Sequence, residues 1–253
     1  MNIDKQLVSQ RFGRNLATYH EQAVVQRDIA DTLASSLLAA CPALHIRRAM
    51  EIGIGTGFLT RHLLAACPEA EWHLNDITPE AFRWIDELGH PGAIHYYPGD
   101  AETIPYPENL DLIATASAVQ WFDDISAFLA KAHAALAPGG ILAVSTFGPE
   151  NFVEIRHILN RGLEYPTLET LRQWASQTGY RILHAHDWTR RLTLGTPLDV
   201  LRHIKKTGVN GTRSETWNRR TLADFHTNYH TRYADHEGNI PLSYHPIVLI
   251  LQK

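Results

Sequence analysis

Residues 48–146 alternate between two hydrophobic periods, and this alternation predicts an α/β architecture. Short apolar runs bounded by turn residues predict strands at 48–52, 71–75, 94–97, 110–116 and 141–146. Apolar residues spaced by three or four predict the intervening helices at about 57–66, from Thr78 onward and at 123–136. Pro138-Gly139-Gly140 predicts a turn into the fifth strand. Such alternation through short loops is typical of a mostly parallel sheet with helices on both faces.

The flanking segments have a looser pattern. Residues 4–40 predict two N-terminal helices with a break near Tyr19–His20. Beyond residue 150 we expect helices at 150–161, 167–178, 197–206 and 216–233, and strands at about 181–194 and 244–252. The 253 residues and their 44% apolar content suit a single domain over 1–253. Its expected parts are N-terminal helices at 1–41, a cofactor-binding core at 47–147 and a helical insertion at about 196–240 that caps the active-site side.

The first strand leads into a glycine loop, Glu51-Ile-Gly-Ile-Gly-Thr-Gly57. Glycine suits such a turn because the backbone visits positive φ and a ligand must approach it closely. A nicotinamide or flavin dinucleotide site is one interpretation, but its spacing is G-x-G-x-x-G. The Glu51 carboxylate would repel a pyrophosphate and would attract a cationic ligand.

Acidic residues also follow the second and third strands. Asp76 is placed to hold a ribose diol, and Asp100 to accept a hydrogen bond from an adenine amino group. The carboxyl ends of parallel strands share one edge of a sheet, so these acids converge on one crevice; the alternative is that Asp76 and Asp100 only cap the following turns. We therefore expect a site for a nucleoside bearing a sulfonium, built from Glu51, Gly53, Gly55, Gly57, Asp76, Ile77, Asp100, Ala101, Glu102 and Ser117.

With these motifs, residues 47–147 resemble the class I S-adenosylmethionine-dependent methyltransferases, which implies a seven-stranded Rossmann-like fold. Ile54 replaces a small residue that is usual in their glycine loop. The whole chain is similar to the malonyl-carrier-protein O-methyltransferases of biotin synthesis. That similarity lies in the segments Arg11–Tyr19, Gln26-Arg27, Ser117–Phe122, Phe147–Asn151, Leu201–Gly211 and Ile240–Pro246.

The resemblance implies that a methyl group passes from S-adenosylmethionine to the free carboxylate of malonyl-acyl-carrier protein or malonyl-coenzyme A. A carboxylate has a pKa near ~4 and is already a nucleophile, so no general base is expected. We find no Ser/His/Asp or Cys/His signature. The acceptor must instead be positioned, and the candidates are Tyr19, Arg14, Gln120, Trp121 and Phe147. For each of them, core packing or a place on the surface is the alternative.

The charge of the chain limits the kinds of partner that it can bind. The net charge of −4 does not favour a nucleic-acid binder. Between residues 181 and 233 there are ten basic and four acidic side chains. We expect Arg202, Lys205 and Lys206 to receive an acidic carrier protein, and a solvated helix face is the alternative. Pairs such as His184 and His186 find no third ligand, so no metal is expected.

No membrane span or signal peptide is visible, and two separate cysteines suit a cytoplasmic protein. Two rival functions remain. One is methylation of another small acceptor, such as a trans-aconitate-like carboxylate. The other is a cofactor-binding scaffold without turnover, against which the intact glycine loop and its acids argue.

Overall fold

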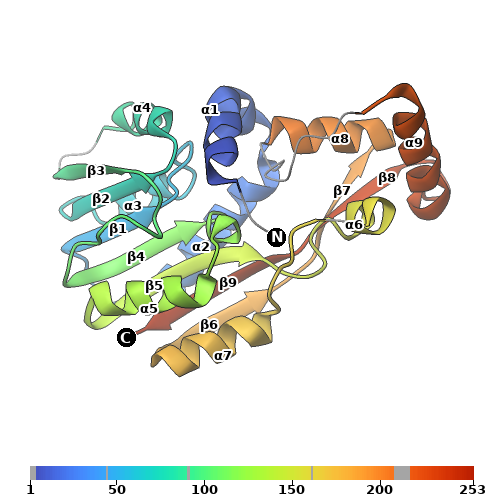
Figure 1. Ribbon diagram of the computed structural model, residues 1–253. Coiled ribbons are helices and arrows are strands. Elements are labelled where there is room, and N and C mark those ends of the chain that lie inside the picture. Colours follow the sequence, from blue (N-terminus) through green and yellow to red (C-terminus); the bar gives the residue numbers. More distant parts are fainter. Residues whose placement is uncertain (1–3, 44, 90–91, 161, 208–216) are drawn as a thin grey trace.

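One seven-stranded sheet organises the computed structural model, which describes residues 4–43, 45–89, 92–160, 162–207 and 217–253 (Figure 1). Its order is β3-β2-β1-β4-β5-β9-β6. The strands are β1 Arg48–Ile52, β2 Glu71–Asp76, β3 Ile94–Pro98, β4 Leu110–Ala116, β5 Leu136–Phe147, β6 Arg181–Asp187 and β9 Pro246–Gln252. Neighbours from β3 to β5 are parallel, whereas β9 is antiparallel to both β5 and β6. The expected mostly parallel, seven-stranded sheet is confirmed.

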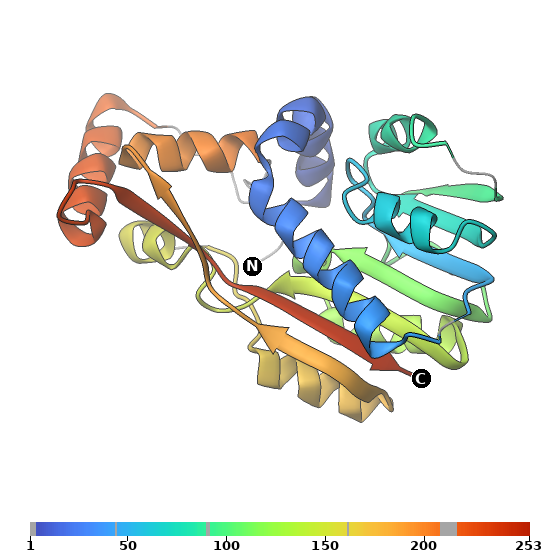
Figure 2. The same ribbon diagram turned by 180° about the vertical axis from the view of Figure 1, so that it is seen from behind.

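Helices cover both faces of this sheet because its central strands are apolar on both sides. The helices α2 (Val24–Ala40) and α3 (Thr60–Ala66) lie on one face, which Figure 2 shows in front. The helices α5 (Ile125–Ala135) and α7 (Leu168–Thr178) lie on the other face, in front in Figure 1. Each face has its own buried hydrophobic cluster. A short 3-10 turn (Pro79–Ala81) and α4 (Phe82–Asp86) connect β2 to β3.

A smaller subassembly stands beyond the ends of β5 and β9, and we call it the cap. It consists of a two-stranded sheet, β7 (Arg190–Leu194) with β8 (Ile240–Tyr244), and the helices α6 (Val153–Leu159), α8 (Pro197–Lys206) and α9 (Arg219–Tyr233). A third cluster, with Val200, Phe225 and Tyr229, fills its interior. Helix α1 (Lys5–Gln22) packs against α8, so the N-terminal helices bridge the cap and the main sheet. Among the described residues, no helix is long and apolar enough to cross a bilayer.

The structure corrects several expected boundaries. The break between α1 and α2 is at Ala23, not at Tyr19–His20. Pro138-Gly139-Gly140 lies within β5 rather than before it, at an irregularity where the pairing with β4 passes from Leu136 to Ile141. The helix expected from residue 216 begins at Arg219, and residues 208–216, which include the end of the 201–211 segment, lie outside the described part.

The strand expected at 181–194 is two strands, because the chain leaves the main sheet after Asp187. There the Trp188 amide donates to the Pro246 carbonyl, and the Asp187 carboxylate bonds the His245 ring at 2.8 Å. His245 separates β8 from β9, so both strand pairs change sheets at the same point. The cap strands are thereby placed beside the carboxyl end of β5.

Candidate active site

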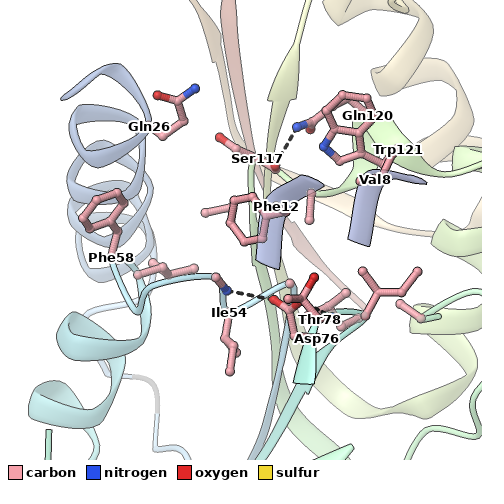
Figure 3. A pocket seen from close by; sticks show the side chains of 18 of the residues that line it. Val8, Phe12, Gln26, Ile54, Phe58, Asp76, Thr78, Ser117, Gln120 and Trp121 are labelled. Atoms are coloured by element: carbon pink, nitrogen blue, oxygen red, sulfur yellow. Dashed lines mark hydrogen bonds between the residues drawn. The ribbon is translucent and has the colours of Figure 1, made fainter. Parts of the chain in front are cut away.

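A cavity opens at the carboxyl edge of the parallel strands; together with its open mouth it encloses about 1220 Å³ of unfilled space. Its walls come from the ends of β1, β2, β4 and β5, from α1 and α2, and from the cap. Figure 3 shows Asp76 and Thr78 at one end of this space and Gln26, Ser117 and Gln120 at the other. The crevice expected from the strand ends is therefore present, and it is roofed by the N-terminal helix α1.

The glycine loop forms the floor beneath β1. Gly53 has φ +69°, and a Cβ there would lie 2.5 Å from the Cβ of Ala118, so only glycine fits without a shift. Gly55 has φ +54°, and its amide donates to Asp76 Oδ2 at 2.9 Å. Gly57, which we expected in the cofactor site, does not line the cavity; its open side faces Ile85. Its role is to let the loop pack on the following helices.

Glu51 places a buried carboxylate at the cavity wall, with one of its oxygens unpaired. The residue is 1% exposed, and its Oε2 has no hydrogen-bond partner among the described residues. Burial raises its pKa to about 8; the Thr60 hydroxyl acts in the opposite direction, and the charge of nearby Asp76 adds to the rise. A buried acid without a partner is unfavourable unless a ligand supplies the missing donor or cation. This arrangement fits the ammonium and sulfonium of S-adenosylmethionine.

Asp76 serves the turn as well as the cavity. Its Oδ1 accepts from the Thr78 amide at 2.7 Å, and its Oδ2 accepts from the Gly55 amide. Burial raises its pKa to about 6, although these backbone bonds act in the opposite direction. Each carboxylate oxygen can accept more than one bond, so the capping role does not prevent Asp76 from receiving ribose hydroxyls. Ile77 follows it in the cavity wall.

The loop after β3 is held to α1 by Lys5. Asp100 and Ala101 line the cavity, and Asp100 Oδ2 accepts from the Lys5 ammonium of α1 at 2.8 Å. Glu102, which we expected in the cofactor site, is not among the residues that line the cavity. Its oxygens accept from the amides of Asp123 and Asp124 at the start of α5 and from Lys5. Glu102 therefore caps α5 and anchors α1.

The expected acceptor candidates divide between wall and surface. Ser117, Gln120 and Trp121 line the cavity after β4; Ser117 has φ +54°, rare for a residue with a side chain, and its Oγ has no partner among the described residues. Phe147 from β5 and Tyr19 from α1 also line it. Arg14 does not, because it lies on the exposed side of α1.

The expected partner-binding residues lie on α8. Arg202 Nη1 is 2.7 Å from Asp199 Oδ1 on the same helix, so it is already engaged. Lys205 and Lys206 are exposed and directly precede Thr207, which lines the cavity. These two lysines are exposed basic residues in the last turn of α8, next in the sequence to a cavity residue. Among the described residues, no group of three His, Cys, Asp or Glu is arranged to hold a metal.

Several cavity residues were not among the predicted site residues. Gln26 from α2, Asn151 after β5, Tyr244 from β8 and Thr207 line the end opposite the acids. Spacing gives no hint of them, because they come from segments far apart in the chain. All four fall inside the segments that carried the resemblance, and that was the available signal.

Known proteins that are similar to this chain include methyltransferases. A methyltransferase-domain family model matches residues 50–144. Malonyl-(acyl-carrier protein) O-methyltransferases of Porphyromonas gingivalis and Haemophilus influenzae are 37% and 35% identical to it; each alignment covers 98% of this chain, and 96% and 95% of those proteins.

Solved structures are similar in fold. The YcgJ protein of Bacillus subtilis has a TM-score of 0.66 at 16% identity, covering 88% of this chain and 98% of that one. An S-adenosylmethionine-dependent methyltransferase of Mesorhizobium loti has a TM-score of 0.55 at 17% identity, covering 87% of this chain and 96% of that one.

The family assignment rests on the full-length relatives. The chain belongs to the malonyl-(acyl-carrier protein) O-methyltransferase family of S-adenosylmethionine-dependent enzymes.

Proposed function

We propose that this chain methylates the free carboxylate of a malonyl group carried as a thioester by acyl carrier protein, as its relatives' name states for them. The product is a malonyl methyl ester that enters biotin synthesis. The observation that carries this proposal is one cavity with two unlike ends: an acidic end around Glu51, and an opposite end lined by neutral polar and aromatic side chains.

The residues divide the work between them. S-adenosylmethionine supplies an electrophilic methyl group; Glu51, Asp76 and Asp100 would hold its ammonium, ribose and adenine, respectively. The malonyl carboxylate oxygen forms the new C–O bond while the C–S bond breaks, and no proton moves. Trp121 and Phe147 border the reacting space and exclude water from it. Catalysis therefore depends on position rather than on an acid or base.

The carrier protein would approach the cap. Lys205 and Lys206 are exposed beside Thr207 at the cavity, so an acidic carrier helix bound there would deliver its thioester arm at the acceptor end. A free small acid needs no such surface, which supports a carrier-bound substrate over a trans-aconitate-like one.

Labelled S-adenosylmethionine, offered with malonyl-carrier protein, malonyl-coenzyme A or trans-aconitate, tests the proposal. We expect methyl ester from the malonyl thioesters. Label found in aconitate alone would contradict the proposed function. Tight binding of S-adenosylhomocysteine with no label in any acceptor would indicate a scaffold instead.

A further inference from the structure

The acceptor end of the cavity offers hydrogen-bond donors without positive charge. Its polar lining includes Gln26, Asn151, Thr207 and Tyr244, joined by Tyr19, Ser117 and Gln120. Among the described residues that line the cavity, the one cation is Lys5, and its ammonium is held by Asp100 at the other end. A carboxylate placed here therefore meets amide and hydroxyl groups, not a guanidinium.

Gln26 and Tyr244 face each other in this lining. Gln26 is 6% exposed, and the Oε1 position of its amide has no partner among the described residues. Figure 3 shows it across the cavity from Ser117 and Gln120. Burial raises the pKa of the Tyr244 hydroxyl, and hydrogen bonding from Gln26 and Thr207 opposes that rise. In Figure 3 the amide nitrogen of Gln26 is on the side of Ser117 and Gln120, so its N–H groups are directed toward the cavity.

His203 holds the Tyr244 hydroxyl from behind. Its Nε2 lies 2.8 Å from Tyr244 Oη, and the residue belongs to helix α8 of the cap. Burial lowers the pKa of His203, with Lys206 adding to that effect, so the ring is neutral near pH 7. When the single ring proton is on Nε2, it donates to Oη and turns the tyrosine's own proton toward the cavity.

We propose that Gln26 and Tyr244 bind the acceptor carboxylate, and that His203 is a positioning residue that directs the Tyr244 proton at it. This inference rests on the proposed function, since it concerns the carboxylate of the same substrate.

Neutral donors suit this reaction better than a cation would. The carboxylate loses its negative charge as the C–O bond forms, so a guanidinium would stabilise the reactant more than the transition state. Amide and hydroxyl groups orient the same oxygen atoms while holding the charge less strongly. The location of Arg14 outside the cavity agrees with this requirement.

We call the pair Gln26 and Tyr244 the carboxylate cradle. Two variants test the cradle, Tyr244→Phe and Gln26→Met. Each removes a bond to a charged acceptor, so we expect KM for the malonyl thioester to rise about ten-fold or more. Inhibition by the acetyl thioester, which has no carboxylate, and affinity for S-adenosylhomocysteine should stay at wild-type values. Tyr229→Phe is the matched control, because it removes a buried hydroxyl that donates to the Pro241 carbonyl outside this cavity.

His203 needs a separate pair of variants. We expect His203→Leu to raise KM as Tyr244→Phe does, and His203→Gln, which keeps a donor, to recover part of the loss. Wild-type KM in both Tyr244→Phe and Gln26→Met would overturn the cradle and leave the proposed function standing. Equal losses for malonyl substrate, acetyl inhibitor and cofactor would also overturn it, since they mean a structural role. A wild-type protein that methylates no malonyl thioester removes the function and the cradle together.

Discussion

Glu51 is a single residue whose protonation connects the cofactor site to pH. Its pKa of about 8 in the folded protein lies above the ordinary value of 4.5, so without ligand the side chain is mostly protonated at pH 7. The stabilising effect of this raised pKa is complete below about pH 4.5 and is lost as pH rises through 8. A cation beside Glu51 favours the ionised form and reverses that penalty.

Binding of S-adenosylhomocysteine at pH 7 should therefore release a proton from Glu51, up to about one per site. Titration calorimetry in buffers of different ionisation enthalpy measures this release. We expect Glu51→Gln to abolish it and the exposed Glu69→Gln to leave it unchanged. Heats that do not vary with the buffer in the wild-type protein would contradict the assignment.

Comparing Gly53 with Gly89 separates two reasons for a glycine: a positive φ, and a neighbouring atom too close for a side chain. Both have positive φ, at +69° and +61°, but a Cβ at Gly53 meets Ala118, whereas no described residue beyond the chain neighbours lies within 4 Å of one at Gly89. Gly89→Ala should lower the free energy of unfolding by about 1–2 kcal/mol through backbone conformation alone. Gly53→Ala should lower it further and weaken cofactor binding, as urea unfolding and calorimetry would measure. Equal losses in the two variants would show that the close approach has no effect.

At the scale of elements, α1 is held over the cavity by one side chain. Lys5 is 17% exposed and lies within ion-pair distance of Asp100, Glu102 and Asp123. Burial opposes its charge, but these carboxylates together raise the pKa of Lys5 above its ordinary value. The same helix contributes Phe12 to the cavity wall, so its position and the shape of the site are linked.

Lys5→Met should leave three carboxylates without their shared cation and loosen α1. We expect a loss of about 1–3 kcal/mol in unfolding free energy, weaker cofactor binding and faster tryptic cleavage after Arg14. Arg47→Met removes a 76% exposed partner of Asp111 and serves as the control, with a loss below about 0.5 kcal/mol. Unchanged proteolysis in Lys5→Met would show that α1 is held by its apolar contacts.

The main sheet was predictable where one local signal dominated. The bounds of β1 and β4 match the expected strands because both are continuous buried runs. The division of 181–194 into β6 and β7 was not predicted, since it depends on Trp188 and Asp187 meeting residues about 60 positions away. The acidic end of the cavity follows from neighbouring strand ends, whereas the bonds of Glu102 to α5 and Lys5 are tertiary contacts that the sequence does not indicate.

At the scale of the whole molecule, the two ends of the cavity come from different parts of the chain. The acidic end is formed by residues 51–101, and the acceptor end combines α2, the end of β5 and the cap. The cap thus joins substrate recognition to the surface where a carrier would dock.

Charge reversal at Lys205 and Lys206 should raise KM for malonyl-carrier protein, and the effect should be larger at low than at high salt. Exposed charges interact over about 10 Å at 0.1 M salt and over about 3 Å at 1 M. Steady-state kinetics at both salt concentrations measure the difference. Arg172→Glu, on α7 away from the cap, is the matched control. An effect that does not change with salt would contradict docking at this surface.

The antiparallel strand β9 has a consequence for how the protein forms during synthesis. It lies between β5 and β6, yet it is translated after both. Until it emerges from the ribosome, β5 presents an open edge and β6 has no neighbour in the main sheet. The five strands β3-β2-β1-β4-β5 can assemble beforehand. The nascent chain can therefore form the acidic end of the cavity before the acceptor end exists.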